Sequence, residues 1–152
     1  MLRLFRWFLL PCICLSIQGA DSSGLFLGAH AGSRSYGLGG TAYFATSYFL
    51  GPRLSVQAYR ITPADSISSN LSTSYSVGIG FSNKLYLDYE RLSEPLKYPN
   101  SFGNGYGIKM GAGYDIKSES FPINLGGFVA YRSGNGNSNV EVGIQITYMF
   151  PF

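Results

Sequence analysis

The sequence has little charge, little cysteine and a single histidine, and each shortage argues against a class of protein. Asp, Glu, Lys and Arg make up 12% of the 152 residues, about half the share that is usual in a soluble domain. The two cysteines, Cys12 and Cys14, lie near the N-terminus, which leaves no thiol for a disulfide or a metal site elsewhere. The Lys and Arg residues form no cluster, so nucleic acid is not an expected partner. We therefore expect no cofactor, no metal and no nucleic acid.

The N-terminal segment has the pattern of a secretory signal peptide. Arg3 and Arg6 precede an apolar run from Trp7 to Ile17, which is too short to cross a membrane as a helix. Both cysteines lie in this segment. We therefore predict a signal peptide over residues 1–20 and one exported domain over residues 21–152, with a net charge of about +1.

The exported part shows no long stretch with the period of an amphipathic helix, but apolar and polar residues alternate in eight segments. The clearest segment is 70–82, where Tyr75, Val77 and Ile79 alternate with serine and glycine. Such alternation is typical of strands with one apolar face. It predicts strands at 24–32, 36–45, 53–61, 70–82, 84–92, 103–116, 121–132 and 139–152.

The length of the last segment and the spacing of the connections predict the architecture. At roughly 3.4 Å per residue, 139–152 spans about 40 Å, enough for a tilted strand to cross the hydrocarbon core of a bilayer. Short connections alternate with longer ones at 62–69, 93–102 and 133–139, as in bacterial outer-membrane barrels. The chain is therefore predicted to be all-β: an eight-stranded antiparallel up-and-down transmembrane β-barrel.

Residue types indicate which face of these strands points outward. Segment 103–116 carries an apolar row with Tyr106 and Tyr114 near its ends, and Phe81 ends the row of segment 70–82. Aromatic residues at both edges of an apolar band are typical of the two membrane interfaces. The alternative is a soluble sandwich or lipocalin-like barrel with these rows inside. That alternative would expose serine and glycine faces with almost no Lys or Glu to prevent association.

The opposite parity then lines the interior. Glycines of this parity leave room for the large side chains Tyr59, Tyr86 and Phe128; they are Gly78, Gly80, Gly105, Gly107, Gly111 and Gly113. Titratable residues of this parity form one predicted polar network: His30, Asp88, Glu90, Lys109, Arg132 and Glu141. Because buried charges need partners, we expect Asp88 and Glu90 to face Lys109. We also expect Arg132 at the depth of Glu141, and His30 near Glu141 where the first and last strands meet.

Part of this network also has the residue types of a catalytic site. His30, Glu141 and a serine such as Ser133 would supply the base, the acid and the nucleophile of acyl transfer. The simpler interpretation is a polar network that closes the pore. We favour that interpretation and predict no catalytic residue.

The closing strand carries the motif Glu141-x-Gly143-x-x-Ile146-x-Tyr148, followed by Phe150 and Phe152. With this motif, the chain resembles the small outer-membrane β-barrel family of Gram-negative bacteria, of the OmpX and OmpA transmembrane-domain type. In that family a polar-x-Gly-x-x-apolar-x-aromatic pattern is the assembly signal. The resemblance implies an outer-membrane location, contact with outer-membrane lipid and lipopolysaccharide, and recognition by the barrel assembly machinery.

Three functions are compatible with these features. The first is a structural or surface-interaction scaffold with a plugged interior, whose loops 62–69, 93–102 and 133–139 contact lipopolysaccharide or other surface ligands. The second is a narrow channel for small solutes, which requires a gap among Gln57, Asp88, Lys109 and Gln145. The third is a lipid A modifying hydrolase or acyltransferase, although the His-x-Ser motif of the similar deacylases is missing. We favour the scaffold. The fold alone does not determine which of the three functions applies.

Overall fold

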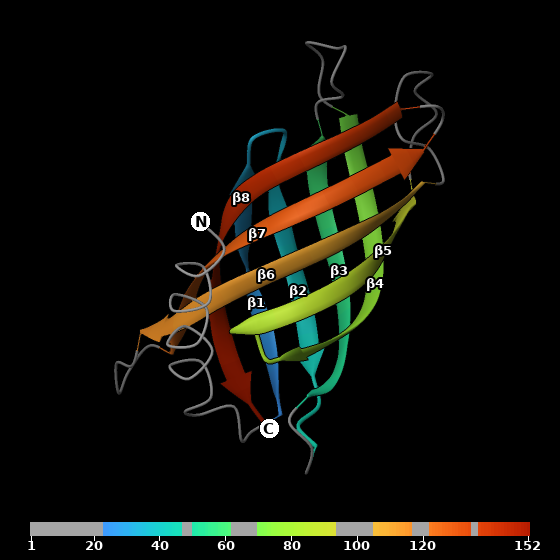
Figure 1. Ribbon diagram of the computed structural model, residues 1–152. Coiled ribbons are helices and arrows are strands. Elements are labelled where there is room, and N and C mark those ends of the chain that lie inside the picture. The colour runs from blue at the N-terminus through green and yellow to red at the C-terminus, as the bar shows by residue number, and fades with distance from the viewer. Residues whose placement is uncertain (1–22, 47–49, 62–69, 94–104, 117–121, 135–136) are drawn as a thin grey trace, which may run out of the picture.

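The computed structural model describes residues 23–46, 50–61, 70–93, 105–116, 122–134 and 137–152, which form a barrel of eight strands (Figure 1). The strands are β1 (Gly24–Gly32), β2 (Ser35–Tyr43), β3 (Gly51–Ile61), β4 (Asn70–Phe81), β5 (Leu85–Ser93), β6 (Tyr106–Ile116), β7 (Ile123–Gly134) and β8 (Asn137–Pro151). Each strand pairs antiparallel with the next, and β8 pairs antiparallel with β1. The prediction of an all-β, eight-stranded up-and-down barrel is confirmed.

The predicted signal peptide, 1–20, and the predicted loop 62–69 lie outside the described residues. The predicted loop 93–102 does so as well, apart from Ser93, which ends β5. In the part of the chain that the structure describes, no helix has the length and apolar character needed to span a membrane.

The predicted loop at 133–139 is wrong, because the hairpin of β7 and β8 is much tighter. Gly134 pairs with Asn137, and Ser133 pairs with Ser138. Gly, Asn and Ser favour turns, but here their backbones continue the longest ladder of the barrel. Strand β6 likewise begins at Tyr106 rather than at residue 103, and Gly105 precedes it, where its carbonyl accepts a hydrogen bond from Leu92 N at 2.9 Å.

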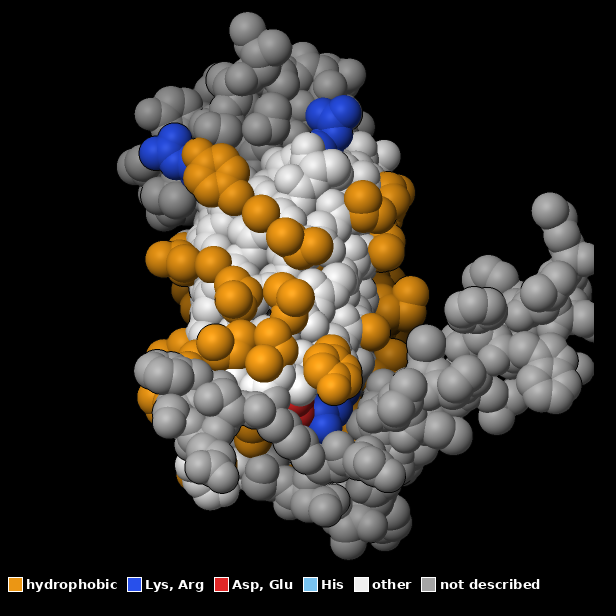
Figure 2. Space-filling model, turned by 90° about the vertical axis from the view of Figure 1, so that its left-hand side faces the viewer, with side chains coloured by type: hydrophobic (Ala, Val, Ile, Leu, Met, Phe, Trp, Pro, Cys, Tyr) orange, Lys and Arg blue, Asp and Glu red, His pale blue; other side chains and the backbone are white. Residues whose placement is uncertain are grey.

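The outer face of the barrel is apolar, as the alternation predicts. On β6 the outward residues Met110 and Tyr114 are 55% and 70% exposed, whereas Lys109, the residue before Met110, is 2% exposed. The same alternation runs along β8, where Ile144 is 64% and Glu141 is 1% exposed. Hydrophobic side chains consequently cover the strands on the face shown in Figure 2. A barrel with the apolar rows inside is therefore excluded for this chain.

Phe81 is an exception to the predicted outer row. Its side chain is only 8% exposed, because it precedes a tight turn in which Lys84 N donates to Phe81 O at 3.1 Å. Ser82 has a φ of 60° in this turn, and Ser82, Asn83 and Lys84 are all at most 5% exposed. Phe81, the last residue of β4, thus adjoins a buried turn and is not an exposed part of the outer row.

The barrel has two different ends. We call the end with the 82–84 turn, where β1 begins and β8 ends, the turn end; it carries the C label in Figure 1. The opposite end, with the connections 33–34, 62–69 and 94–104, is called the loop end. This division matters for the interior, where the charged side chains gather near both ends.

Candidate functional site in the barrel interior

The ion pairs of the interior, taken together with the buried Lys109, contain equal numbers of positive and negative side chains. The four cations and four anions are Arg53, Lys84, Lys109, Arg132, Asp88, Glu90, Asp115 and Glu141. Seven of these eight side chains form ion pairs, and the eighth, Lys109, is buried. Every residue of the predicted polar network is buried, with exposed fractions from 1% for Glu90 to 7% for His30. Because an isolated buried charge is costly, this balance allows so many charges to be held inside.

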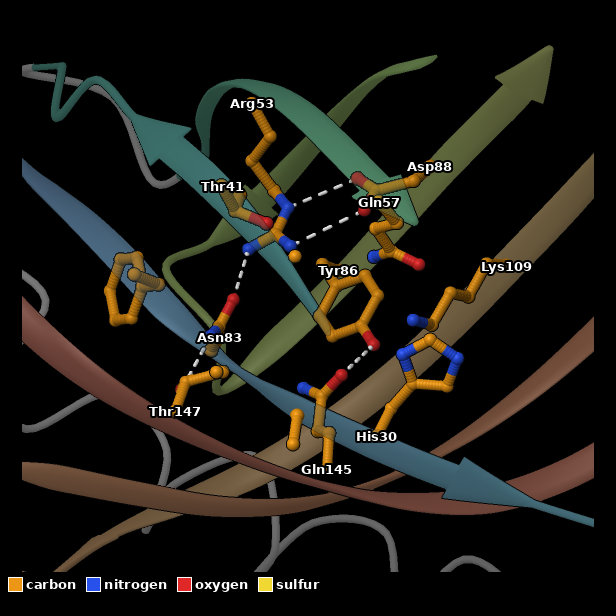
Figure 3. Close-up of a pocket in the computed structure, with 14 residues that line it drawn as sticks. His30, Thr41, Arg53, Gln57, Asn83, Tyr86, Asp88, Lys109, Gln145 and Thr147 are labelled. Atoms are coloured by element: carbon orange, nitrogen blue, oxygen red, sulfur yellow. Dashed lines mark hydrogen bonds and ion pairs between the residues drawn. The ribbon is translucent and has the colours of Figure 1, made fainter. Parts of the chain in front are cut away.

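Arg53 is the centre of a turn-end cluster, which also contains Asp88, Ser82, Asn83 and Thr147. The Arg53 Nε and Nη2 groups donate to the two Asp88 carboxylate oxygens at 3.0 and 3.3 Å. The Nη1 group donates to the Ser82 carbonyl and, at 2.9 Å, to Asn83 Oδ1. Asn83 Nδ2 in turn donates to Thr147 Oγ1 on β8 at 2.9 Å (Figure 3). The buried turn is therefore tied to three strands, β3, β5 and β8.

Two further contacts complete the turn end. The Arg53 guanidinium lies 4.1 Å from the centre of the Tyr86 ring, a cation–π distance. At the rim, Lys84 Nζ and Asp115 Oδ2 are 2.9 Å apart. Gly113 N also donates to Lys84 O at 2.9 Å, so the turn is fastened to β6 as well.

The sequence reasoning missed Arg53, although its position carries a usable pattern. Arg53 shares the inward parity of Tyr59 on β3. Gly78 of β4 pairs with Arg53 on one side and with Asp88 on the other. Because glycine has no side chain, the Arg53 and Asp88 side chains meet above it. A Cβ at Gly78 would collide with the Asp88 carboxylate.

Arg132 is the centre of a loop-end cluster with Glu90, Glu141, Ser35 and His30. Its Nε donates to Glu90 Oε2 at 2.9 Å, and its Nη1 donates to Glu141 Oε2. Ser35 Oγ donates to Glu141 Oε1 at 2.7 Å. All three charged side chains are 1% exposed. One arginine therefore bridges two buried carboxylates.

The geometry of the loop-end cluster repeats that of the turn end. Gly107 of β6 pairs with Glu90 on β5 and with Arg132 on β7, so this ion pair also spans a glycine on the strand between. Glu90 therefore forms its ion pair with Arg132, two strands away, and not with Lys109 on the neighbouring strand as expected. The arginine side chain is long enough to cross the intervening strand, because Gly107 has no side chain that would block it.

Lys109 lies between the two clusters. It pairs in register with Asp88 as expected, but its Nζ lies 4.3 Å from the centre of the Phe128 ring, and the carboxylate of Asp88 binds Arg53 instead. The sequence thus predicted the strand register correctly and the ion-pair partner wrongly.

His30 and Glu141 are connected through a residue that the sequence did not single out. Ser35 Oγ donates to Glu141 and lies 3.5 Å from His30 Nε2. The His30 ring packs edge-on against Tyr59 and Phe128, with ring centres 5.7 and 5.8 Å apart. Arg132 reaches Glu141 diagonally, since Glu141 pairs in register with Ala130 and Arg132 with Asn139.

Ser133 does not belong to this group. It pairs with Tyr106 and Ser138 on the outward parity, away from His30 and Glu141. The nearby serine is Ser35, but its hydroxyl proton is directed to the carboxylate rather than to the histidine. The order of contacts is therefore histidine–serine–carboxylate, whereas acyl transfer requires the histidine between the other two.

A small cavity separates the two clusters. Its lining includes Gln57, Asp88, Lys109 and Gln145, the four residues among which a channel would need a gap. Its volume is about 20 Å³, space for about one water molecule. Tyr86 Oη donates to Gln145 Oε1 at 2.8 Å, while Gln57 Oε1 and Gln145 Nε2 have no protein partner. Figure 3 shows these polar groups around the cavity.

The residues of the assembly motif divide between the two faces of β8. Glu141 is in the loop-end cluster, and Gly143 faces the Phe128 ring, where a Cβ would lie 2.5 Å from Phe128 Cζ. Ile146 and Phe150 point outward, 49% and 45% exposed. The other two aromatic residues take part in ring contacts: Tyr148 with Phe150 at 4.6 Å, and Phe152 with Phe44 at 6.1 Å.

Within the described ranges, no group of three or more His, Cys, Asp or Glu side chains is arranged to hold a metal ion. No family model, no curated protein and no solved structure matches this chain. The interpretation of the site therefore rests on its own geometry.

Proposed function

We propose that this chain is an integral outer-membrane β-barrel protein, which acts as a structural and surface-interaction scaffold with a plugged interior. The observation that supports this most is the inside-out distribution of side chains. Residues such as Leu38 and Ile144, 67% and 64% exposed, cover the outside, while eight charges are paired or balanced inside. A closed sheet with an apolar outer band satisfies its backbone hydrogen bonds in lipid without an exposed edge.

The membrane location is tested by electrophoresis of an outer-membrane fraction. Boiled and unboiled samples of a stable barrel should migrate differently, because the folded barrel resists detergent until it is heated. The protein should also stay with the membrane pellet in urea at a concentration that strips peripheral proteins. Identical migration together with release by urea would contradict the proposal.

The proposal includes the barrel assembly machinery as a partner that recognises β8. Phe150 and Phe152 are 45% and 68% exposed, so replacing both with Ser should leave the interior unchanged. We expect less of the Phe150→Ser/Phe152→Ser variant in the outer membrane. The free energy of unfolding of the purified, refolded protein should fall by no more than the two lost ring contacts contribute, about 0.5–1.5 kcal/mol each. Normal insertion in cells would remove the assembly role and leave only the strand.

The plugged interior is tested by electrical recording. The two ion-pair clusters lie on either side of a cavity of about 20 Å³, which is far smaller than the aqueous path of a porin. We expect no conductance steps from the purified protein in planar bilayers. The presence of Gln57, Asp88, Lys109 and Gln145 around that cavity favours a narrow channel as the second candidate, and reproducible steps would select it.

An enzymatic role is the remaining alternative. The direction of the Ser35 hydroxyl and the outward position of Ser133 both weaken the case for a lipid A hydrolase or acyltransferase. We expect lipid A from cells that overproduce the protein to have an unchanged mass. A lost or added acyl chain that disappears in the His30→Ala variant would instead support catalysis.

A further inference from the structure

Two arginines on the outer face of the barrel have no role in the interior network. Arg60 and Arg91 are exposed, and every other charged side chain in the described part of the chain is buried or half-buried. Their chain neighbours Tyr59, Glu90 and Leu92 are each 1% exposed and point inward, so the arginines point outward. Neither arginine takes part in an ion pair within the described residues.

Both arginines lie at the loop end beside tyrosines of neighbouring strands. Arg60 is the penultimate residue of β3 and pairs with Tyr36 on β2. Arg91 is near the end of β5 and pairs with Tyr75 on β4 and Tyr106 on β6. These tyrosines are 57%, 57% and 46% exposed. Side chains of directly paired residues project from Cβ atoms about 4.5–5.5 Å apart, so each arginine has a phenol within reach.

Among the described residues, no positive side chain is exposed on the outer face of the turn end. Its large exposed residues are hydrophobic: the aromatic Phe44, Tyr114, Phe150 and Phe152, together with aliphatic residues such as Ile116. On the face shown in Figure 2, basic side chains lie at the upper end of the barrel, and a basic side chain at the lower end lies beside an acidic one. Within the ranges that the structure describes, the exposed positive charge of the outer face therefore lies at the loop end.

This arrangement fits a phosphate-bearing lipid head group. A guanidinium on the outer face of a barrel is costly near the bilayer centre and tolerated near an interface, where phosphate binds it through two parallel hydrogen bonds. A tyrosine at the same level contributes a hydroxyl donor while its ring stays in the apolar layer. We propose that Arg60 with Tyr36, and Arg91 with Tyr75 and Tyr106, bind the phosphates of a glycolipid in the leaflet at the loop end. This inference rests on the proposed outer-membrane location.

The test is a titration of the full-length protein, purified in a non-ionic detergent, with three probes: phosphorylated lipid A, dephosphorylated lipid A and inorganic phosphate. Binding is followed by the rise in the temperature at which the folded band disappears on a gel. We expect half-saturation at the lowest concentration with phosphorylated lipid A. Each basic group near an anionic lipid surface contributes about fivefold in affinity, so Arg60→Gln/Arg91→Gln should bind about twenty-five-fold more weakly.

Two further sets of variants separate phosphate recognition from general charge and from folding. Arg60→Lys/Arg91→Lys should bind with intermediate affinity, because lysine keeps the charge but not the planar two-pronged geometry. Tyr106→Phe should weaken binding, and the same change at Tyr114, on the opposite end of β6, should not. All variants alter exposed groups, so their heat-dependent migration in the membrane fraction should remain that of the wild type.

Several outcomes would overturn this inference. Equal binding of phosphorylated and dephosphorylated lipid A, or an unchanged affinity in the double glutamine variant, would do so. Equal stabilisation by inorganic phosphate would assign the site to free phosphate rather than to lipid. If the wild type integrates into the membrane and these differences are absent, the inference alone fails. If the wild type does not integrate, the proposed function fails with it.

Discussion

The two ion-pair clusters inside the barrel share a geometry but differ in charge. In each, an arginine reaches a carboxylate two strands away across a glycine: Arg53 reaches Asp88 across Gly78, and Arg132 reaches Glu90 across Gly107. Arg53 has this one carboxylate and completes its hydrogen bonds with the buried turn. Arg132 has a second carboxylate, Glu141.

The two clusters therefore differ in net charge. The turn-end cluster is neutral, and neutral groups of the 82–84 turn satisfy the remaining donors of Arg53. The loop-end cluster has a net charge of −1, from Arg132, Glu90 and Glu141. Lys109 is the remaining buried cation of the network and stands between them. The loop-end cluster therefore holds two buried carboxylates on one arginine, and it should be the more sensitive of the two to the loss of its arginine.

The largest expected effect is the loss of Arg132. Arg132→Met leaves two buried carboxylates with one cation nearby, and breaking a buried pair in this way costs about 3–5 kcal/mol. Arg53→Met leaves only Asp88, which has Lys109 as its register partner, so its cost should be smaller. Urea unfolding of the refolded proteins in detergent micelles measures both free energies.

A triple variant provides the control for this comparison. In Arg132→Met/Glu90→Gln/Glu141→Gln the charges left by Arg132 are neutralised, and much of the lost free energy of unfolding should return. An equal cost for Arg53→Met and Arg132→Met, with no recovery in the triple variant, would remove the distinction between the clusters.

The next effect concerns a glycine whose missing side chain leaves room for an aromatic ring next to a buried cation. Gly143 makes room for Phe128, the ring below Lys109. Gly143→Ala forces these groups apart and should cost about 1–3 kcal/mol. Gly127→Ala is the matched control, because a Cβ there would meet only Gly143 O, at 3.7 Å.

The same variant also distinguishes packing from the assembly role of Gly143. If packing is the reason for the glycine, Phe128→Leu should restore part of the stability of Gly143→Ala in vitro. A Gly143→Ala protein that is fully stable when refolded but poorly inserted in cells would assign the glycine to recognition by the assembly machinery alone.

The sequence predicted the strands and their faces far better than the partners of individual charges. Alternation is a local property, and β1 was placed at residues 24–32, where the structure has it. Strand register then brought Asp88 opposite Lys109 as expected. Ion-pair partners depend on side-chain reach over an intervening strand, which the alternation does not contain. Arg53 was therefore missed, although Gly78 between it and Asp88 marks the position.

Turns were the second source of error, for a different physical reason. Residues 133–139 have turn composition, but the ladder of β7 and β8 continues through Gly134 and Asn137. At the other end, the strands predicted at 70–82 and 84–92 leave room only for a tight turn, but nothing in its composition indicated that Asn83 would be buried and bound to Arg53 and Thr147. Composition reports the tendency of the backbone to turn, whereas burial of the turn follows from the barrel around it.

The smallest expected effect decides which cluster Lys109 belongs to. By proximity in the sheet its partner is Asp88, the residue opposite it. By charge balance its partner is the loop-end cluster, because Asp88 is already neutralised by Arg53 through two hydrogen bonds. Double-mutant cycles with Lys109→Met distinguish the two, since directly coupled groups give interaction energies of about 0.5–3 kcal/mol. The charge balance predicts a larger coupling with Glu90→Gln than with Asp88→Asn. The opposite order would make Lys109 part of the turn-end cluster.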